Sequence, residues 1–164
     1  MRTCWLALIM AVMLTACAAP NRRTQTSGVE PSNLPEWQGR ISVQVLGDAP
    51  SSVSASFWLR GNENQGELDI YSPLGTTVGA LQWTPQAVQF SEGGKLRRFQ
   101  SLAELTEQTT GAALPIDAIF GWLQGRDAQA SGWQADLSTL GKGTLSARRN
   151  HPLPEVTLRI QLDP

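Results

Sequence analysis

Residues that could perform catalysis are few in this sequence, and their spacing matches no familiar catalytic site. The single histidine, His151, precedes Pro152 in a predicted loop. One histidine cannot complete the usual zinc sites, and a catalytic triad needs a base that is held firmly in position. Glu63, Glu67 and Asp69 gather around one predicted strand, where acidic residues are usually just solvated. We therefore expect no enzyme, no metal site and no cofactor.

The residue with the clearest predicted chemistry is Cys17, at the end of an N-terminal secretion signal. Arg2 supplies a positive start, and the apolar run 5–14 is too short to cross a membrane, which takes about 20 residues. The run ends in Leu14-Thr15-Ala16-Cys17, which resembles the lipobox of bacterial lipoproteins. In that motif the thiol receives diacylglycerol, and cleavage before the cysteine frees its amine for a third acyl chain. A chance cysteine after an ordinary signal is the less favoured alternative.

Lipidation of Cys17 predicts a membrane-anchored protein that faces the periplasm. Acyl burial contributes about 0.8 kcal/mol per methylene group, so three chains would hold the protein almost permanently. Cys4 would be lost with the signal, which leaves one cysteine and no possible internal disulfide. Ala18 follows Cys17, whereas an Asp at that place tends to retain Gram-negative lipoproteins in the inner membrane. Its absence implies the outer membrane.

The sequence predicts three segments: a signal peptide over 1–16, a lipidated cysteine with a flexible tether over 17–36, and a folded domain over 37–164. Pro20, Pro31 and Pro35 among polar residues indicate the tether. The 148 residues from Cys17 onward are enough for one domain with a substantial core.

Charge and aromatic content narrow the class of partner. A net charge of −1 gives no basic excess, so we expect no nucleic acid. The pairs Arg97-Arg98 and Arg148-Arg149 could meet lipid headgroups or acidic partners, although solvated strand ends are the favoured interpretation. Five tryptophans from Cys17 onward suit a wide apolar interior or a membrane-facing surface, and an ordinary core could also hold them.

Short segments with period-two alternation predict an antiparallel sheet. In the last of them Val156, Leu158 and Ile160 face one way, while Thr157 and Arg159 face the other. Gly93-Gly94 predicts a hairpin turn. Short strands joined by turns favour a sheet that curls. The predicted strands are 41–45, 53–59, 67–71, 78–83, 87–90, 96–99, 133–137, 144–148 and 156–162.

Two short helices interrupt the strands. Ser101 and Glu104 form a predicted capping box, and that helix would run to about Thr110 and stop at Gly111. Pro115 suits the first position of the second helix. Ile116, Ile119, Phe120 and Leu123 then form one apolar stripe, with Gly125 as the stop. We expect both helices to cover the concave apolar side of the sheet.

The turn Ser72-Pro73-Leu74-Gly75 carries an unexpected residue. Ser, Pro and Gly occupy their usual places in a type I turn, but Leu74 stands where a small polar residue is normal. An exposed leucine forgoes roughly 1.5–3 kcal/mol of possible burial. Leu74 must therefore fold back into the core or touch something apolar outside.

Several segments together resemble the LolB family of outer-membrane lipoprotein receptors. They follow the lipobox in order and extend over most of residues 37–162. Each motif alone is weak, but the combination is fairly specific. The segments are Trp37-Gln38-Gly39-Arg40-Ile41, Ala55-Ser56-Phe57-Trp58, Ser72-Pro73-Leu74-Gly75-Thr76-Thr77, Leu114-Pro115, Trp122-Leu123-Gln124-Gly125 and Gly132-Trp133.

The resemblance implies a fold and a function. Members have an incomplete antiparallel β-barrel covered by helices, with an apolar cavity that accepts the acyl chains of other lipoproteins. The soluble carrier LolA delivers this cargo, and the receptor, expected to be a monomer, inserts it into the phospholipid of the inner leaflet without consuming nucleotide. The leucine of the Pro-Leu-Gly turn serves membrane insertion in that family, which assigns Pro73, Leu74 and Gly75 to an insertion loop here.

The expected cavity residues are the inward apolar side chains of the strands and of the second helix. Which alternating face points inward is open, and Trp58, Trp83 and Trp122 could contribute. The short region after Trp133 and a Pro-rich stretch in place of an N-terminal helix suggest fewer strands and a shallower cavity. The assigned residues are Ile41, Val43, Phe57, Leu68, Ile70, Leu81, Phe90, Ile119, Phe120 and Leu123.

Two other interpretations remain for the function. The chain could hold a different lipid or acyl ligand, or it could be a structural outer-membrane lipoprotein whose core is simply full. A periplasmic hydrolase is a more distant alternative, because the sequence offers no catalytic constellation.

Overall fold

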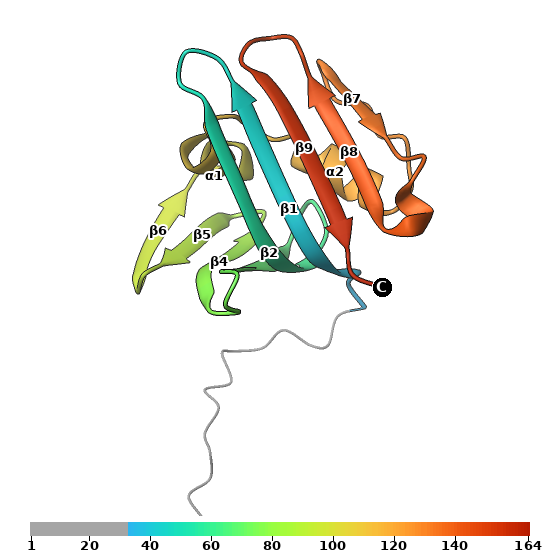
Figure 1. Cartoon of the computed structure of the whole chain (residues 1–164). Helices are drawn as coiled ribbons and strands as arrows, with labels where there is room; N and C mark the ends of the chain where they lie inside the picture. Colours follow the sequence, from blue (N-terminus) through green and yellow to red (C-terminus); the bar gives the residue numbers. More distant parts are fainter. Residues whose placement is uncertain (1–32) are drawn as a thin grey trace, which may run out of the picture. The chain divides into compact units, whose positions relative to one another are not determined.

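The computed structural model describes residues 33–164, which form one compact unit. Within them, nine strands form a single sheet in the order β6-β5-β4-β3-β2-β1-β9-β8-β7, and all neighbours are antiparallel (Figure 1). The sheet is open, because β6 and β7 are its two edges. The strands are β1 Glu36–Leu46, β2 Ser51–Gly61, β3 Gly66–Tyr71, β4 Thr77–Thr84, β5 Ala87–Glu92, β6 Lys95–Phe99, β7 Trp133–Asp136, β8 Thr144–Arg149 and β9 Glu155–Leu162.

The predicted fold class is confirmed, since a curled antiparallel sheet carries two short helices inside its curve (Figure 1). The helices are α1 Leu102–Thr110 and α2 Ile116–Leu123, between β6 and β7 in the chain. A short 3-10 helix, Leu140–Lys142, was not expected from the sequence. None of the helices within residues 33–164 has the length and apolar character needed to cross a lipid bilayer.

Period-two alternation places the apolar face of most strands on the concave side. Val43 of β1 lies opposite Val53 of β2 and Leu158 of β9, so apolar side chains continue across three neighbouring strands. Val156, Leu158 and Ile160 are almost completely buried, as the alternation in that segment predicts. No polar or charged residue of the described part is buried, so the buried side of the sheet is apolar.

Glycines let two aromatic rings lie close to the sheet. A side chain at Gly66 would come within 2.5 Å of the Trp83 ring, and one at Gly79 within 2.9 Å of the Phe90 ring. Real contacts are not that short, so both positions require glycine. The two glycines therefore leave room for the Trp83 ring against β3 and for the Phe90 ring against β4.

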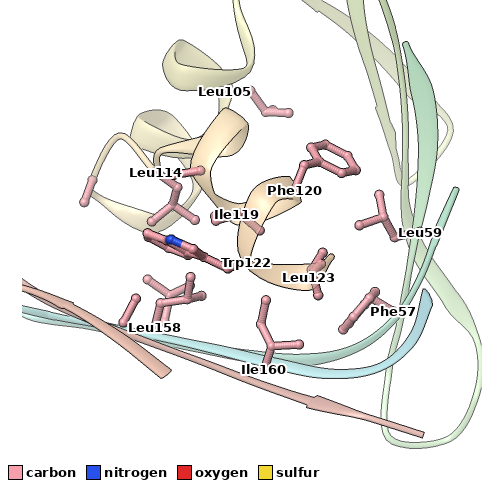
Figure 2. Close-up of a cluster of buried hydrophobic side chains, with 14 of the residues drawn as sticks. Phe57, Leu59, Leu105, Leu114, Ile119, Phe120, Trp122, Leu123, Leu158 and Ile160 are labelled. Carbon is pink, nitrogen blue, oxygen red and sulfur yellow. The ribbon is translucent and has the colours of Figure 1, made fainter. Parts of the chain in front are cut away.

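The second helix provides most of the contacts that hold the helices to the sheet. Phe120 lies against Trp37 and Trp83, with ring centroids 5.8 and 6.1 Å away. Trp122 is 1 % exposed, packs near Trp133 at 6.3 Å and donates its indole N–H to the Ala128 carbonyl at 2.8 Å. Figure 2 shows Phe120 and Leu123 directed toward β2 and Trp122 directed toward β9.

The ends of the helices follow the predicted signals with one difference. Ser101 accepts the Glu104 N–H at 3.1 Å, and the Glu104 carboxylate accepts the Gln100 N–H at 2.7 Å. Gly111 ends α1 in the left-handed conformation with φ of +87°. Pro115, expected at the first helical position, instead immediately precedes α2, which begins at Ile116.

The Ser101 cap makes a testable contribution to stability. Ser101→Ala removes the acceptor for the Glu104 N–H and is expected to lower the free energy of unfolding by about 1 kcal/mol. Urea denaturation followed by circular dichroism measures the change. Ser54→Ala, on an exposed position of β2, is the control and should shift stability by less than about 0.5 kcal/mol. Equal effects of the two substitutions would contradict the capping role.

Candidate functional site

An apolar cavity of about 210 Å³ lies between the concave face and the two helices. Its walls come from β1 to β5, β9, both helices and the segment that joins them. Figure 2 shows part of this interior, with Leu59 and Phe57 across from Phe120 and Leu123. The cavity presents almost no polar surface, so it can hold hydrocarbon but offers no group for acid–base chemistry.

The structure places all ten sequence-assigned cavity residues around this space. Ile41, Val43, Phe57, Leu68, Ile70, Leu81 and Phe90 contribute from the strands, and Ile119, Phe120 and Leu123 contribute from α2. The structure therefore shows that the strand face carrying these side chains is the one turned inward. That these residues hold acyl chains stays a prediction.

The tryptophans divide between inside and outside. Trp83 lines the cavity. Trp122 is buried between α2 and the sheet and is not part of the lining. Trp58 lies at the other face, where its indole N–H donates to the Glu36 carboxylate at 2.7 Å. Only Trp83 among these three therefore adds to the cavity wall.

Sequence reasoning missed part of the lining. Leu59 and Val53 share the alternation of Phe57, so the pattern in β2 could have identified them. The α1 side chains Leu102, Leu105, Thr106, Thr109 and Thr110 had no comparable signal, because α1 lacks a wide apolar stripe. The remaining lining residues are Ala55, Leu114, Ile116 and Ile160.

The threonines of α1 satisfy their hydroxyl groups within the helix. Thr109 donates to the Leu105 carbonyl at 2.8 Å, and Thr110 donates to the Thr106 carbonyl at 2.8 Å. Thr106 donates to the Ala103 carbonyl and accepts the Leu114 N–H at 3.0 Å. Because these hydroxyls already have hydrogen-bond partners, an occupant of the cavity does not need polar groups to satisfy them.

The first helix is held less firmly than the second. Leu105 is the buried residue of α1, whereas α2 buries six of its eight residues. Two hydrogen bonds also hold α1 to the sheet. Ser51 donates to the Thr110 carbonyl at 2.5 Å, and Arg97 donates to the Gln108 amide oxygen at 2.7 Å. With so little apolar burial, α1 can move away from the sheet at a smaller free-energy cost than α2.

A second, more polar groove of about 550 Å³ adjoins the cavity. Trp83, Leu102, Leu114 and Ile116 border both spaces and so form the partition between them. Glu63, Asn64, Thr84, Gln100, Ser101, Asp117 and Gln129 supply polar groups to the groove.

The turn between β3 and β4 projects Leu74 into solvent, where it is 93 % exposed. Ser72 closes the turn: its carbonyl accepts the Gly75 N–H at 2.9 Å, and its N–H donates to the Thr76 carbonyl at 2.9 Å. Gly75 has φ of +78°, which glycine adopts readily. Of the two places considered for Leu74, the structure has the outward one, so a firmly closed turn holds an apolar tip away from the domain.

Tyr71 precedes this turn on β3. Its hydroxyl donates to the Asp69 carboxylate at 3.4 Å. Partial burial and the neighbouring negative charge of Asp69 raise the pKa of Tyr71, so the phenol stays protonated near neutral pH. The base of the turn is therefore polar but carries no added charge from Tyr71.

Other residues singled out in the sequence lie apart from the cavity. Cys17 lies outside the described residues. His151 is exposed in the loop between β8 and β9, and within residues 33–164 no three His, Cys, Asp or Glu side chains gather as metal ligands would. Arg149 stacks over Trp133 and donates to the Pro154 carbonyl at 3.3 Å, so it is not simply solvated.

Comparison with known proteins decides the family. The family described as "Outer membrane lipoprotein LolB" matches residues 36–152. This chain belongs to the LolB family. The match covers most of the curled sheet and both helices that enclose the cavity.

Individual LolB proteins show the same likeness at modest identity. The outer-membrane lipoprotein LolB of Bordetella petrii is 25 % identical over 182 aligned positions, which cover 95 % of this chain and 89 % of that protein. The Serratia proteamaculans LolB is 27 % identical over 74 % of this chain and 58 % of its own length. The Shewanella oneidensis LolB is 31 % identical over 56 % of this chain and 41 % of its own length.

Membership in the LolB family gives the general role and place of the protein. It is a lipoprotein of the outer membrane with a role in lipoprotein localisation, as the sequence resemblance predicts. The LolB family consists of lipoprotein receptors, not enzymes, and the apolar lining of the cavity agrees with that.

The cavity of this LolB-family chain should bind a hydrocarbon probe. Leu68→Trp would place a larger ring in the lining and is expected to weaken binding of a dansylated fatty acid about tenfold, because it occupies the space of the probe. Fluorescence titration measures the affinity. Leu46→Trp, on an exposed position outside the lining, should bind as wild type does. A wild-type protein that binds no probe would argue for a filled, purely structural core.

Proposed function

We propose that this protein receives lipoproteins from the periplasmic carrier LolA and inserts them into the inner leaflet of the outer membrane. The observation that carries the proposal is the apolar cavity beneath two helices on the concave face of an open sheet. Triacylated cargo cannot cross water alone, since each chain has about 15 methylene groups at about 0.8 kcal/mol. A receptor must enclose these groups, and the cavity has the chemical character to do so.

The size of the cavity implies that it opens further with cargo. Its volume is about 210 Å³. Three acyl chains with about 45 methylene groups in all need more room than that. The lightly held α1 is the element that moves, and the partition residues Trp83, Leu102, Leu114 and Ile116 then separate to join the cavity with the polar groove.

An open sheet suits reversible binding. A closed barrel would fix the width of its interior, whereas a curl covered by helices can widen as they shift. Transfer in one direction requires that affinity rise from carrier to receptor to membrane, because a ligand shifts an equilibrium only by differential affinity. No nucleotide is needed for such a cascade. The polar groove beside the cavity would receive the polar glyceryl and peptide end of the cargo.

The remaining assignments complete the proposal. Acyl chains on Cys17 would anchor the protein to the outer membrane, with the domain facing the periplasm. Pro73, Leu74 and Gly75 would form the loop that enters the lipid when cargo is released, since an exposed leucine gains about 1.5–3 kcal/mol on burial. A single copy would suffice, because the cavity is formed within one chain.

Leu74 provides the sharpest test of insertion. Leu74→Glu should leave cargo acceptance intact, because Leu74 does not line the cavity, and should block release into the membrane, because a carboxylate does not enter hydrocarbon. Transfer of a labelled lipoprotein from LolA to the receptor, and from the receptor to vesicles, is measured separately. Leu153→Glu is the matched control, since Leu153 is 72 % exposed in a different loop. Wild-type release from Leu74→Glu would refute the assigned role.

Depletion of the protein tests the identity of the cargo. If lipoproteins are the cargo, depletion should leave them in the periplasm, bound to the carrier. Fractionation and co-purification with LolA measure this, and re-expression of the wild-type gene is the control. Unchanged lipoprotein localisation would favour a receptor for another lipid.

A further inference from the structure

Three of the large exposed apolar side chains lie at one end of the sheet. Within the described residues such side chains are Leu46, Val53, Leu74, Val78, Leu96 and Leu153. The β3–β4 turn and the β5–β6 turn are at the same end, because Gly79 beside the first turn pairs with Glu92 beside the second. Figure 1 shows both turns at the lower side of the drawing. Leu74, Val78 and Leu96 therefore occur in two adjacent hairpins.

Val78 and Leu96 share the convex face. Ala80, Ser91 and Leu96 lie opposite one another across β4, β5 and β6 and so point to one side of the sheet. Val78 is two residues from Ala80 and points the same way. The strands that carry Val78 and Leu96 are about 10 Å apart, and Val78 is one same-face position nearer the turns than the row of Ala80, Ser91 and Leu96. This pair forms an apolar patch outside the cavity.

The β5–β6 hairpin also has an excess of positive charge. Lys95, Arg97 and Arg98 are exposed on β6, against Glu92 as the one acidic residue in positions 87–99. Arg97 is engaged with Gln108 and lies 4.8 Å from the Phe99 ring centre. Arg98 lies on the same face of this edge strand as Leu96, whereas Lys95 stands at the tip of the hairpin on the other face, opposite Glu92. The hairpin thus combines hydrocarbon with cationic groups.

Two other loops carry exposed leucines without this excess of positive charge. Leu46 and Leu153 stand in or beside the β1–β2 and β8–β9 loops, at the upper side of Figure 1. Asp48 and Glu155 there are matched in number by Arg148 and Arg149, and Arg149 is engaged with Trp133 and the Pro154 carbonyl. An anionic surface would therefore be attracted more strongly to the β5–β6 hairpin than to these two loops.

We propose that the β5–β6 hairpin is a second membrane-contact element, in which Leu96 enters an anionic phospholipid surface while Lys95 and Arg98 bind its phosphates. It rests on the proposed function, since it acts beside the Leu74 loop. Each cation adds attraction to anionic lipid, and Leu96 adds burial. Two separate contacts would fix the orientation of the domain, whereas Leu74 alone would leave it free to rotate.

Vesicle binding by the chain without its acyl anchor tests the proposal. The full chain from residue 17, with Cys17→Ala, is titrated with vesicles of phosphatidylethanolamine and phosphatidylglycerol and, separately, with phosphatidylcholine vesicles. Leu96→Glu should weaken binding to the anionic vesicles about tenfold. Arg98→Gln should weaken it about fivefold on anionic vesicles only. Leu46→Glu, at 55 % exposure compared with 59 % for Leu96, should bind as the parent does.

The outcomes separate this proposal from the receptor function. Fatty-acid binding is measured on every variant, and normal binding shows that the domain is folded with its cavity intact. If Leu74→Glu loses vesicle binding while Leu96→Glu keeps it, the hairpin proposal is wrong and the receptor function stands. Absence of vesicle binding by the parent chain, or an equal loss from Leu46→Glu, would also overturn the hairpin proposal. Loss of fatty-acid binding by the parent would instead count against the receptor function.

Discussion

Phe120 is held between the rings of Trp37 and Trp83, which belong to β1 and β4. These strands are separated by β2 and β3 in the sheet, so both can contact one side chain only if the sheet bends around it. The aromatic contact therefore couples the position of α2 to the curvature of the sheet. The concave apolar face and the space beneath α1 both depend on that curvature.

The second helix is packed firmly against the sheet, whereas the first is held by few buried contacts. The second helix buries most of its residues and closes the core near β9, whereas the first contributes Leu105 and a row of threonines with satisfied hydroxyls. A site that must take up bulky hydrocarbon and later release it needs one rigid wall and one compliant wall.

Local sequence signals predicted the elements well because each signal is short-range. Alternation around Phe57 and Leu158 predicted strands and an apolar face, and the Ser101 cap predicted the start of α1. The cavity volume and the polar groove were beyond such reasoning, since they depend on how side chains distant in sequence pack. The opposite directions of Trp58 and Trp83 were equally undetermined, because both lie in strands with large residues on both faces. Leu74 stood out because it violates ordinary turn composition.

The open sheet leaves β6 and β7 with unpaired backbone edges, which are natural templates for strand pairing with a neighbouring molecule. Lipid-anchored proteins share a thin layer and meet at high surface density, so fibre-like stacking is a hazard for them. The cations on β6 repel a second β6, and β7 is only four residues long. A scaffold that must stay unclosed can thereby remain dispersed along the membrane.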